Sequence, residues 1–133
     1  YKTYVNEKSL YNTPPCFGIY IMMLVSRWIL KQGAEKLYSR NAEKAAKIYS
    51  AIDAGFYKGT AVKESRSDMT ITFRLPTEAL EEQFVKEAAK LGMKGLKGHR
   101  SVGGIRASVY NAFPMEGVDA LVSFMRDFAK KNG

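Results

Sequence analysis

The 133-residue sequence has little of the chemistry that marks secreted or metal-binding proteins: it contains one cysteine and one histidine. A single cysteine, Cys16, excludes a disulfide bond within the chain, and no cysteine and histidine cluster has metal-ligand spacing. A reducing compartment is the simpler assumption, so we expect a cytoplasmic protein in which the Cys16 thiol is buried in apolar surroundings. The sequence therefore predicts neither a disulfide framework nor a metal site.

The chain also lacks a hydrophobic run long enough to cross a bilayer. The apolar run from Cys16 to Val25 stops at Ser26-Arg27. We interpret this run as a helix of the hydrophobic core and expect no membrane partner.

Acidic residues are scarce: 13 aspartates and glutamates face 21 lysines and arginines, a formal net charge of +8. One hypothesis is therefore a nucleic-acid-binding module with a basic face. However, the basic residues are spread along predicted helix surfaces, and no RNA-binding or helix-turn-helix signature is present. We favour a solvated basic surface without a nucleic-acid partner. The basic residues expected on helix surfaces are Lys31, Lys36, Arg40, Lys44 and Lys47.

A third hypothesis is that the chain is a purely structural dimerisation piece.

Hydrophobic periodicity predicts the remaining elements. Residues Ala34 to Ala54 should form an amphipathic helix, Met69 to Leu75 a half-buried strand, and the residues after the Thr77 cap a helix that ends at Gly92. A last helix follows Pro114, and Val62 to Glu64 flank a short strand or loop. The expected inward residues of the three helices are Tyr38, Ala42, Ala45, Tyr49 and Ile52, then Leu80, Phe84, Val85 and Ala88, then Val118, Leu121, Val122, Met125 and Phe128.

The element order that we predict is ααβαββα, without internal repeats. This order favours an α+β fold with helices packed on a small sheet.

The most informative stretch is residues 98–114, which places the only histidine and two arginines around a glycine turn that leads into a strand. Alternation puts Ile105 on the apolar face and Arg106 on the opposite face. A guanidinium is a planar fork that matches a carboxylate or phosphate. If residues 101–104 reverse the chain, His99 and Arg100 at one end and Arg106 at the other could hold a molecule with an anionic group at each end.

Two alternatives stay open for this stretch. His99 and Arg100 could be solvated loop residues, with Arg106 in an ion pair at the rim. The glycines of the segment fit tight turns and a close approach of the backbone to a bound group equally well.

A second motif, residues 11–15 (Tyr-Asn-Thr-Pro-Pro), combines a hydroxyl group with two prolines. Thr13 followed by Pro14 is the pattern of a helix start. Helix starts attract phosphate, although Thr13 could act as a cap alone.

With the run from Gly95 to Ala112 and the motif at residues 11–15, the sequence resembles the phosphoserine aminotransferases, class V pyridoxal-phosphate enzymes of fold type I. The likeness extends from about Tyr11 to Gly133 and covers only the carboxy-terminal part of that family. It implies a carboxy-terminal small domain at residues 16–133, preceded by a connecting segment at residues 1–15.

The resemblance implies a transaminase of serine biosynthesis that converts 3-phosphohydroxypyruvate and glutamate to O-phosphoserine and 2-oxoglutarate. His99 and Arg100 would contact the substrate phosphate, and Arg106 would hold the α-carboxylate. Asn12 and Thr13 would reach the phosphate of pyridoxal 5'-phosphate in the neighbouring subunit of a homodimer.

No catalytic residue can be assigned in this chain. Transamination needs a lysine that holds the cofactor, an acid at the pyridine nitrogen and usually a stacked aromatic ring, and none of these is matched here. The chain begins at Tyr1 without an initiator methionine. We therefore expect it to be part of a longer protein whose large cofactor-binding domain precedes it, and to be inactive alone.

Overall fold

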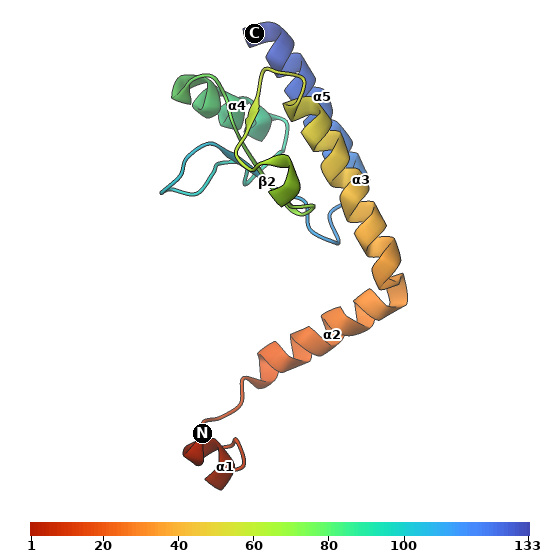
Figure 1. Cartoon of the computed structure of the whole chain (residues 1–133), viewed down its shortest axis with the longest axis vertical. Helices are drawn as coiled ribbons and strands as arrows, with labels where there is room; N and C mark the ends of the chain where they lie inside the picture. Colours follow the sequence, from red (N-terminus) through yellow and green to blue (C-terminus); the bar gives the residue numbers. More distant parts are fainter. The chain divides into compact units, whose positions relative to one another are not determined.

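The computed structural model describes all 133 residues, which divide into two compact units, Tyr1–Leu37 and Tyr38–Gly133. The predicted boundary between residues 15 and 16 stays a prediction. Figure 1 follows the chain from the amino terminus through the helices and strands. The elements are α1 (Lys2–Asn6), α2 (Cys16–Gln32), α3 (Ala34–Ile52), β1 (Lys58–Gly59), β2 (Thr70–Arg74), α4 (Glu78–Lys90), β3 (Ile105–Ser108) and α5 (Met115–Asn132), with a 3₁₀ turn at Lys63–Ser65.

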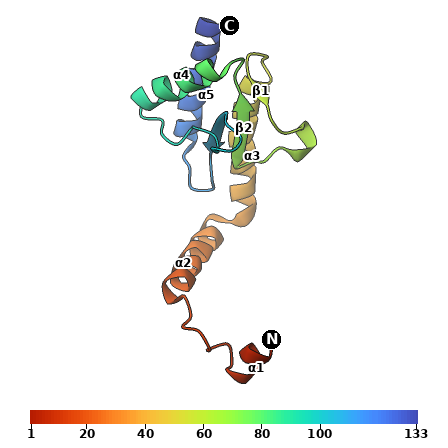
Figure 2. The same ribbon diagram turned by 90° about the vertical axis from the view of Figure 1, so that its left-hand side faces the viewer.

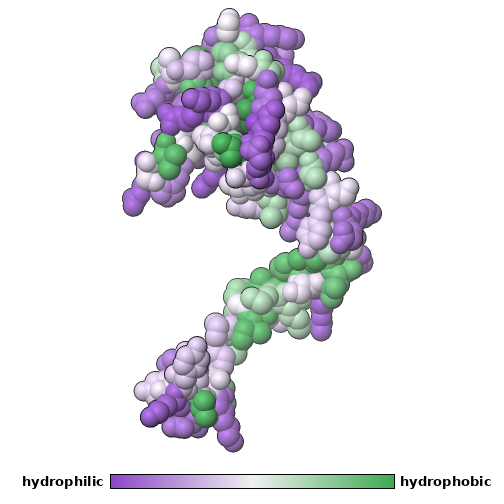
Figure 3. Space-filling view, viewed as in Figure 1, coloured by the Kyte–Doolittle hydropathy of each residue, from purple (hydrophilic) through white to green (hydrophobic).

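The first unit is dominated by α2, which continues through Ser26-Arg27 to Gln32. The prediction of a core helix is wrong for this chain, because no residue of α2 is buried. Figure 3 shows the hydrophobic side chains along α2 at the surface. The Cys16 thiol is likewise exposed rather than buried. Residue periodicity identifies an apolar helix, but it does not reveal whether the same chain supplies the surface that covers it.

No helix has both the length and the apolar character that are needed to cross a membrane.

The second unit contains a three-stranded antiparallel sheet in the order β1-β2-β3. Thr70 lies opposite Ser108 and Thr72 lies opposite Arg106 in the pairing of β2 with β3. The predicted order ααβαββα is wrong in two respects: the short helix α1 was not predicted, and the additional strand, β1, precedes β2 instead of following α4. Only an isolated bridge between Lys97 and Ile105 lies before β3. The two-residue β1 contains a glycine and has no alternating apolar pattern that could have predicted it.

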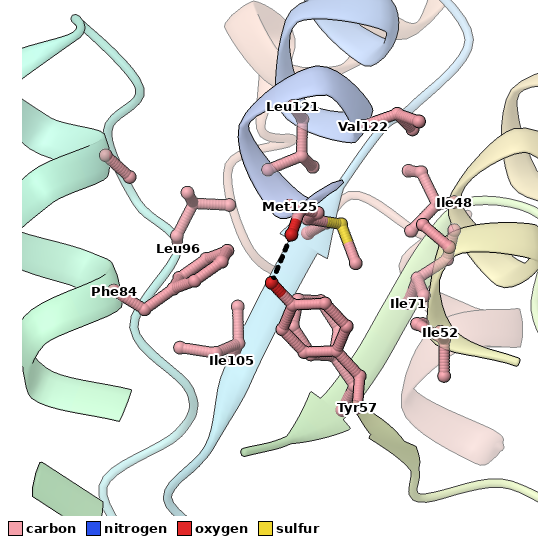
Figure 4. Packing of buried hydrophobic residues seen from close by; sticks show 14 of the residues in the cluster. Ile48, Ile52, Tyr57, Ile71, Phe84, Leu96, Ile105, Leu121, Val122 and Met125 are labelled. Carbon is pink, nitrogen blue, oxygen red and sulfur yellow. Dashed lines mark hydrogen bonds between the residues drawn. The ribbon is translucent and has the colours of Figure 1, made fainter. Parts of the chain in front are cut away.

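Helices α3, α4 and α5 contribute to one core with the apolar face of the sheet, which confirms the predicted α+β class (Figure 2). The sheet face contributes Ile71 and Phe73 from β2 and Ile105 and Ala107 from β3, all nearly inaccessible to solvent. Figure 4 shows how side chains from the helices and both strands meet. All five inward residues predicted for α5 are buried: Val118, Leu121, Val122, Met125 and Phe128.

The buried face of α3 differs from the predicted one. Tyr38 and Ala42 are exposed and Tyr49 is partly buried, whereas Asn41 and Lys44 are buried. The side-chain amide of Asn41 donates to that of Asn111 at 2.6 Å. A prediction from an apolar stripe assigns polar residues to the exposed face of a helix, so it did not identify Asn41 and Lys44 as buried. The face that the structure buries is formed by Leu37, Asn41, Lys44, Ala45, Ile48, Ala51 and Ile52.

Lys44 is fully buried, which corrects its expected place on a basic helix surface. Its Nζ donates to the carbonyl oxygens of Val109 at 2.8 Å and Tyr110 at 2.6 Å, with a longer contact of 3.4 Å to Phe113. Burial, aided by the nearby charge of Arg40, lowers the pKa of Lys44 below its ordinary value of 10.5. The hydrogen bonds of Lys44 thus link α3 to the segment that follows β3.

Candidate anion-binding site

The glycine loop, residues 98–104, is a closed turn between two paired arms of the chain. The Gly98 N–H donates to the carbonyl of Gly104 at 2.8 Å, and the Arg106 N–H donates to the carbonyl of Leu96 at 2.8 Å. At the tip, the His99 carbonyl accepts hydrogen bonds from the N–H groups of two later loop residues, at 2.9 and 2.8 Å. The chain therefore reverses where the sequence predicted, and His99 and Arg100 lie in the turn that leads into the Arg106 strand.

Of the two explanations that the sequence left open for these glycines, the structure shows the tight turn. Gly103 and Gly104 have φ angles of +74° and +73°, in the left-handed region that favours glycine. A Cβ at Gly98 would overlap the carbonyl oxygen of Gly103. The loop therefore needs glycine for its backbone conformation and for the close approach of its two arms.

His99 is exposed, and one of its ring nitrogens is engaged within the loop. The Ser101 N–H donates to Nδ1 at 3.3 Å, and the Ser101 hydroxyl lies 2.6 Å from the same nitrogen. Since Nδ1 accepts a hydrogen bond from the backbone, the neutral ring carries its proton on Nε2. The ring therefore offers a donor at Nε2 to an anion near the tip of the loop.

Arg106 lies on the sheet face opposite the core, as predicted from the alternation of β3. Its neighbours in β3, Ile105 and Ala107, are buried, while Arg106 is partly buried. It forms no ion pair within the chain, and its Nε is buried without an acceptor. The alternative in which Arg106 forms a rim ion pair is therefore not what this chain shows.

Tyr110 extends the polar face of β3 beyond Arg106. Hydrogen bonding to the hydroxyls of Thr70 and Ser108 lowers the pKa of Tyr110 below 10, and the positive charge of Arg106 adds to the shift. The pKa of Tyr110 thus reflects the hydroxyl groups and the guanidinium that lie beside it on this face.

Sequence reasoning missed two residues beside the loop, Arg74 and Glu81. Arg74 Nε lies 2.6 Å from Glu81 Oε1, and Arg74 Nη1 donates to the Val102 carbonyl at 2.7 Å. Glu81 Oε2 accepts the Gly104 N–H at 3.2 Å. One signal was available: Glu81 has helical spacing with Phe84 and Ala88, so it faces the core, where a carboxylate needs partners.

The capping of α4 was predicted correctly, and it helps to place Glu81. The Thr77 hydroxyl oxygen accepts the Leu80 N–H at 3.2 Å. The first turn of α4 is therefore fixed directly after β2, and Glu81 follows one turn later on the buried side.

Asn12 and Thr13 lie in the first unit, and both are exposed. The prediction that Thr13 caps a helix is wrong, because α2 begins at Cys16 with Pro15 at the cap position and no side-chain capping bond. Two consecutive prolines move the helix start beyond reach of the Thr13 hydroxyl. The amide of Asn12 and the hydroxyl of Thr13 have no hydrogen-bond partner in the chain, so both are free to bind a ligand.

The family of the chain is shown by comparison with protein-family models. The family model described as Aminotransferase class-V matches residues 1–121. The chain therefore belongs to the class-V aminotransferase family.

Several similar proteins carry the name phosphoserine aminotransferase. A phosphoserine aminotransferase of Desulfosudis oleivorans is 57% identical over 136 residues, which covers 100% of this chain and 38% of that protein. The solved phosphoserine aminotransferase from Bacillus circulans subsp. alkalophilus has a TM-score of 0.90 and 54% identity, covering 100% of this chain and 38% of that one. The phosphoserine aminotransferase from Trichomonas vaginalis, solved with bound PLP, has a TM-score of 0.82 and 40% identity over 95% of this chain and 37% of its own. The chain thus spans less than two fifths of the length of these relatives.

Proposed function

We propose that this chain acts within a phosphoserine aminotransferase, which transfers an amino group from glutamate to 3-phosphohydroxypyruvate and forms O-phosphoserine and 2-oxoglutarate. The observation that carries the proposal is the glycine loop, which places His99 and Arg100 in one fixed turn and leads into a strand where Arg106 has no ion-pair partner. The names of relatives that are more than half identical support the same activity.

The substrate assignment follows from charge and shape. Phosphoserine carries a phosphate at one end and an α-carboxylate at the other. A dianionic phosphate suits the cationic tip of the loop, where the donor of His99 and the guanidinium of Arg100 lie in adjacent residues. A planar carboxylate suits the guanidinium fork of Arg106, which is fixed on a strand and has donors to spare.

Pyridoxal 5'-phosphate belongs to the same proposal, and the residues present fit a limited share of its binding. When bound, the cofactor supplies the electron sink that transamination requires. The side chains of Asn12 and Thr13 are exposed and unpaired, so they can donate to a phosphate oxygen. Neither residue carries charge, so other parts of the enzyme must neutralise the cofactor phosphate.

The roles of this chain's residues are binding and orientation. The loop holds the phosphate, Arg106 orients the carboxylate, and Asn12 with Thr13 contacts the cofactor phosphate of a neighbouring subunit in a homodimer. No residue of the chain is proposed as the cofactor-bearing lysine, so the 133 residues alone should not catalyse the reaction. A cytoplasmic location, consistent with the single free cysteine, is part of this proposal.

Kinetics of the complete enzyme with Arg100→Ala and Arg106→Ala test the proposal. Both variants should raise the KM for phosphoserine while the cofactor absorbance stays unchanged, because both arginines bind substrate only. Phosphoethanolamine, which lacks the carboxylate, separates the two roles: as an inhibitor it should weaken in Arg100→Ala and keep its potency in Arg106→Ala.

The matched control is Arg126→Ala, since Arg126 is exposed and has no ion-pair partner in the chain. Its kinetics should match those of the wild type. Loss of the cofactor band in Arg100→Ala or Arg106→Ala would contradict the proposed roles, as would turnover of phosphohydroxypyruvate by the isolated 133 residues.

A further inference from the structure

We propose that Arg74 and Glu81 are positioning residues that hold the glycine loop in its anion-binding conformation and thereby set the affinity for the substrate phosphate. This inference rests on the proposed function. Neither side chain forms a hydrogen bond or ion pair with His99 or Arg100, and the inference assigns both residues a role through the backbone of the loop.

Glu81 fixes the start of the Arg106 strand. Glu81 is 8% exposed, and its carboxylate accepts the Gly104 N–H on Oε2 at 3.2 Å and the Leu75 N–H on Oε1 at 3.3 Å. One side chain of α4 therefore joins the last residue of the glycine loop to the end of β2. A buried carboxylate is stable only when such donors and a cation surround it.

Arg74 supplies that cation and also reaches the tip of the loop. Its Nε pairs with Glu81 at 2.6 Å, while its Nη1 donates to the Val102 carbonyl at 2.7 Å. A Cβ on Gly104 would come within 2.7 Å of Arg74 Cδ, so the arginine packs directly on the loop backbone. The distance to a second carboxylate, that of the exposed Glu78, is 3.9 Å, which is too long for a hydrogen bond.

The geometry distinguishes positioning from direct binding. Arg74 uses Nε for Glu81 and Nη1 for the Val102 carbonyl, and its charge is opposed by a buried carboxylate. Arg100, by contrast, has no such partners. Arg74 meets its two acceptors with two different nitrogens of a planar fork, whereas a lysine offers a single Nζ. The role therefore depends on shape as well as charge.

Inhibition of the complete enzyme by inorganic phosphate tests this role. Arg74→Ala should raise the inhibition constant of phosphate and the KM for phosphoserine by about tenfold or more, because it removes charge-assisted hydrogen bonds that hold the loop, and their loss has effects of that order. The kcat at saturating phosphoserine should be retained. Arg74→Lys should resemble Arg74→Ala, since it keeps the charge and loses the fork.

The control is Arg66→Ala, which removes an arginine of the same unit that pairs with Asp53 at 2.6 Å and covers the ring of Tyr49. It should leave the phosphate inhibition constant unchanged. If Arg74→Ala does not fold, Glu81→Gln keeps the size of the side chain and an acceptor, and it should still weaken phosphate inhibition about threefold, equivalent to roughly 0.7 kcal/mol.

The outcomes separate the inference from the proposed function. A wild-type enzyme that phosphate does not inhibit, or that does not use phosphoserine, contradicts the proposed function. A wild type that behaves as proposed, with unchanged phosphate inhibition in Arg74→Ala and Glu81→Gln, overturns the positioning role. Full phosphate affinity in Arg74→Lys overturns it as well, because charge alone would then suffice.

Discussion

The hydroxyl group of Tyr57 donates a 2.8 Å hydrogen bond to the carbonyl oxygen of Met125 and so joins the segment after α3 to α5 (Figure 4). Tyr57 is buried, and its ring meets Phe73 edge to face at 5.2 Å. Burial raises the pKa of Tyr57, because the phenolate would be poorly solvated there. Tyr57 therefore contributes apolar contacts to the core and a hydrogen bond that links the segment after α3 to α5.

Tyr57→Phe should lower the free energy of unfolding by about 1 kcal/mol, the usual net value of a hydrogen bond whose acceptor keeps another partner. Urea unfolding followed by circular dichroism measures this change. Tyr38→Phe is the control, since Tyr38 is 63% exposed and should leave stability unchanged. Equal effects of the two substitutions would contradict the role given to the Tyr57 hydroxyl.

Phe84 lies at the centre of the aromatic cluster, where it contacts the rings of Phe73 and Phe128 at centroid distances of 5.9 and 5.1 Å. Phe84→Ala should lower the free energy of unfolding by about 3–5 kcal/mol, because it removes buried apolar area and leaves a cavity. Calorimetric unfolding provides the measurement. Leu91→Ala, at a position that is 65% exposed, should change stability by no more than about 0.5 kcal/mol. A loss below about 1 kcal/mol for Phe84→Ala would show that the core is not packed as described.

Gly104→Ala separates backbone strain from steric overlap when it is compared with Gly92→Ala. Both glycines have positive φ angles, +73° and +83°, but only Gly104 is crowded: a Cβ there would lie 2.9 Å from the carbonyl oxygen of Phe73. Gly92→Ala should cost about 1 kcal/mol for conformation alone. Gly104→Ala should cost about 1–3 kcal/mol more, since it also overpacks the loop. Urea unfolding of both variants measures the difference. Equal losses of unfolding free energy would mean that the loop backbone shifts enough to accommodate the added Cβ.

The Asp53–Arg66 pair predicts a pH effect on the acid side. Hydrogen bonding to the Arg66 guanidinium lowers the pKa of Asp53 below its ordinary value of 3.8. The unfolded chain regains the ordinary pKa, so the contribution of the pair to stability is complete above pH 3.8 and is lost as the pH falls through the folded pKa. Arg66→Ala should bring the Asp53 pKa back toward 3.8 in a carbon-13 NMR titration of its carboxyl group. Arg126→Ala should leave that titration unchanged, and an unshifted Asp53 in the wild type would contradict the pairing.

The sequence was sufficient to predict which residues of β3 face the core, because that packing follows from side-chain alternation. Ile105 and Ala107 point to the core and Arg106 points away because successive strand residues alternate. The Thr77 cap was likewise identifiable, because a hydroxyl before a helix accepts a neighbouring N–H. These features are local, so they need no knowledge of which distant segment lies beside them.

Long-range hydrogen bonds limited the prediction. Lys44 is buried because the carbonyls that it binds, at Val109 and Tyr110, lie 65 and 66 positions later in the chain. Arg74 and Val102 are separated by 28 positions, so no periodic pattern in the sequence could have predicted their contact. The sequence thus pointed to the residues that we propose contact the anion, and it did not reveal the long-range contacts of Lys44 and Arg74.

The enclosure of Lys44 has a consequence for covalent chemistry. Lysine acylation requires a free, neutral amine that meets the reagent, and the Nζ of Lys44 is shielded from solvent and engaged with backbone carbonyls. Under native conditions Lys44 should remain unmodified while Lys36 and Lys94, which are exposed, react. Its labelling rate, followed by mass spectrometry, would then report how often α3 separates from the segment after β3. Acylation of the most buried lysine in this basic chain would therefore measure local opening of the fold.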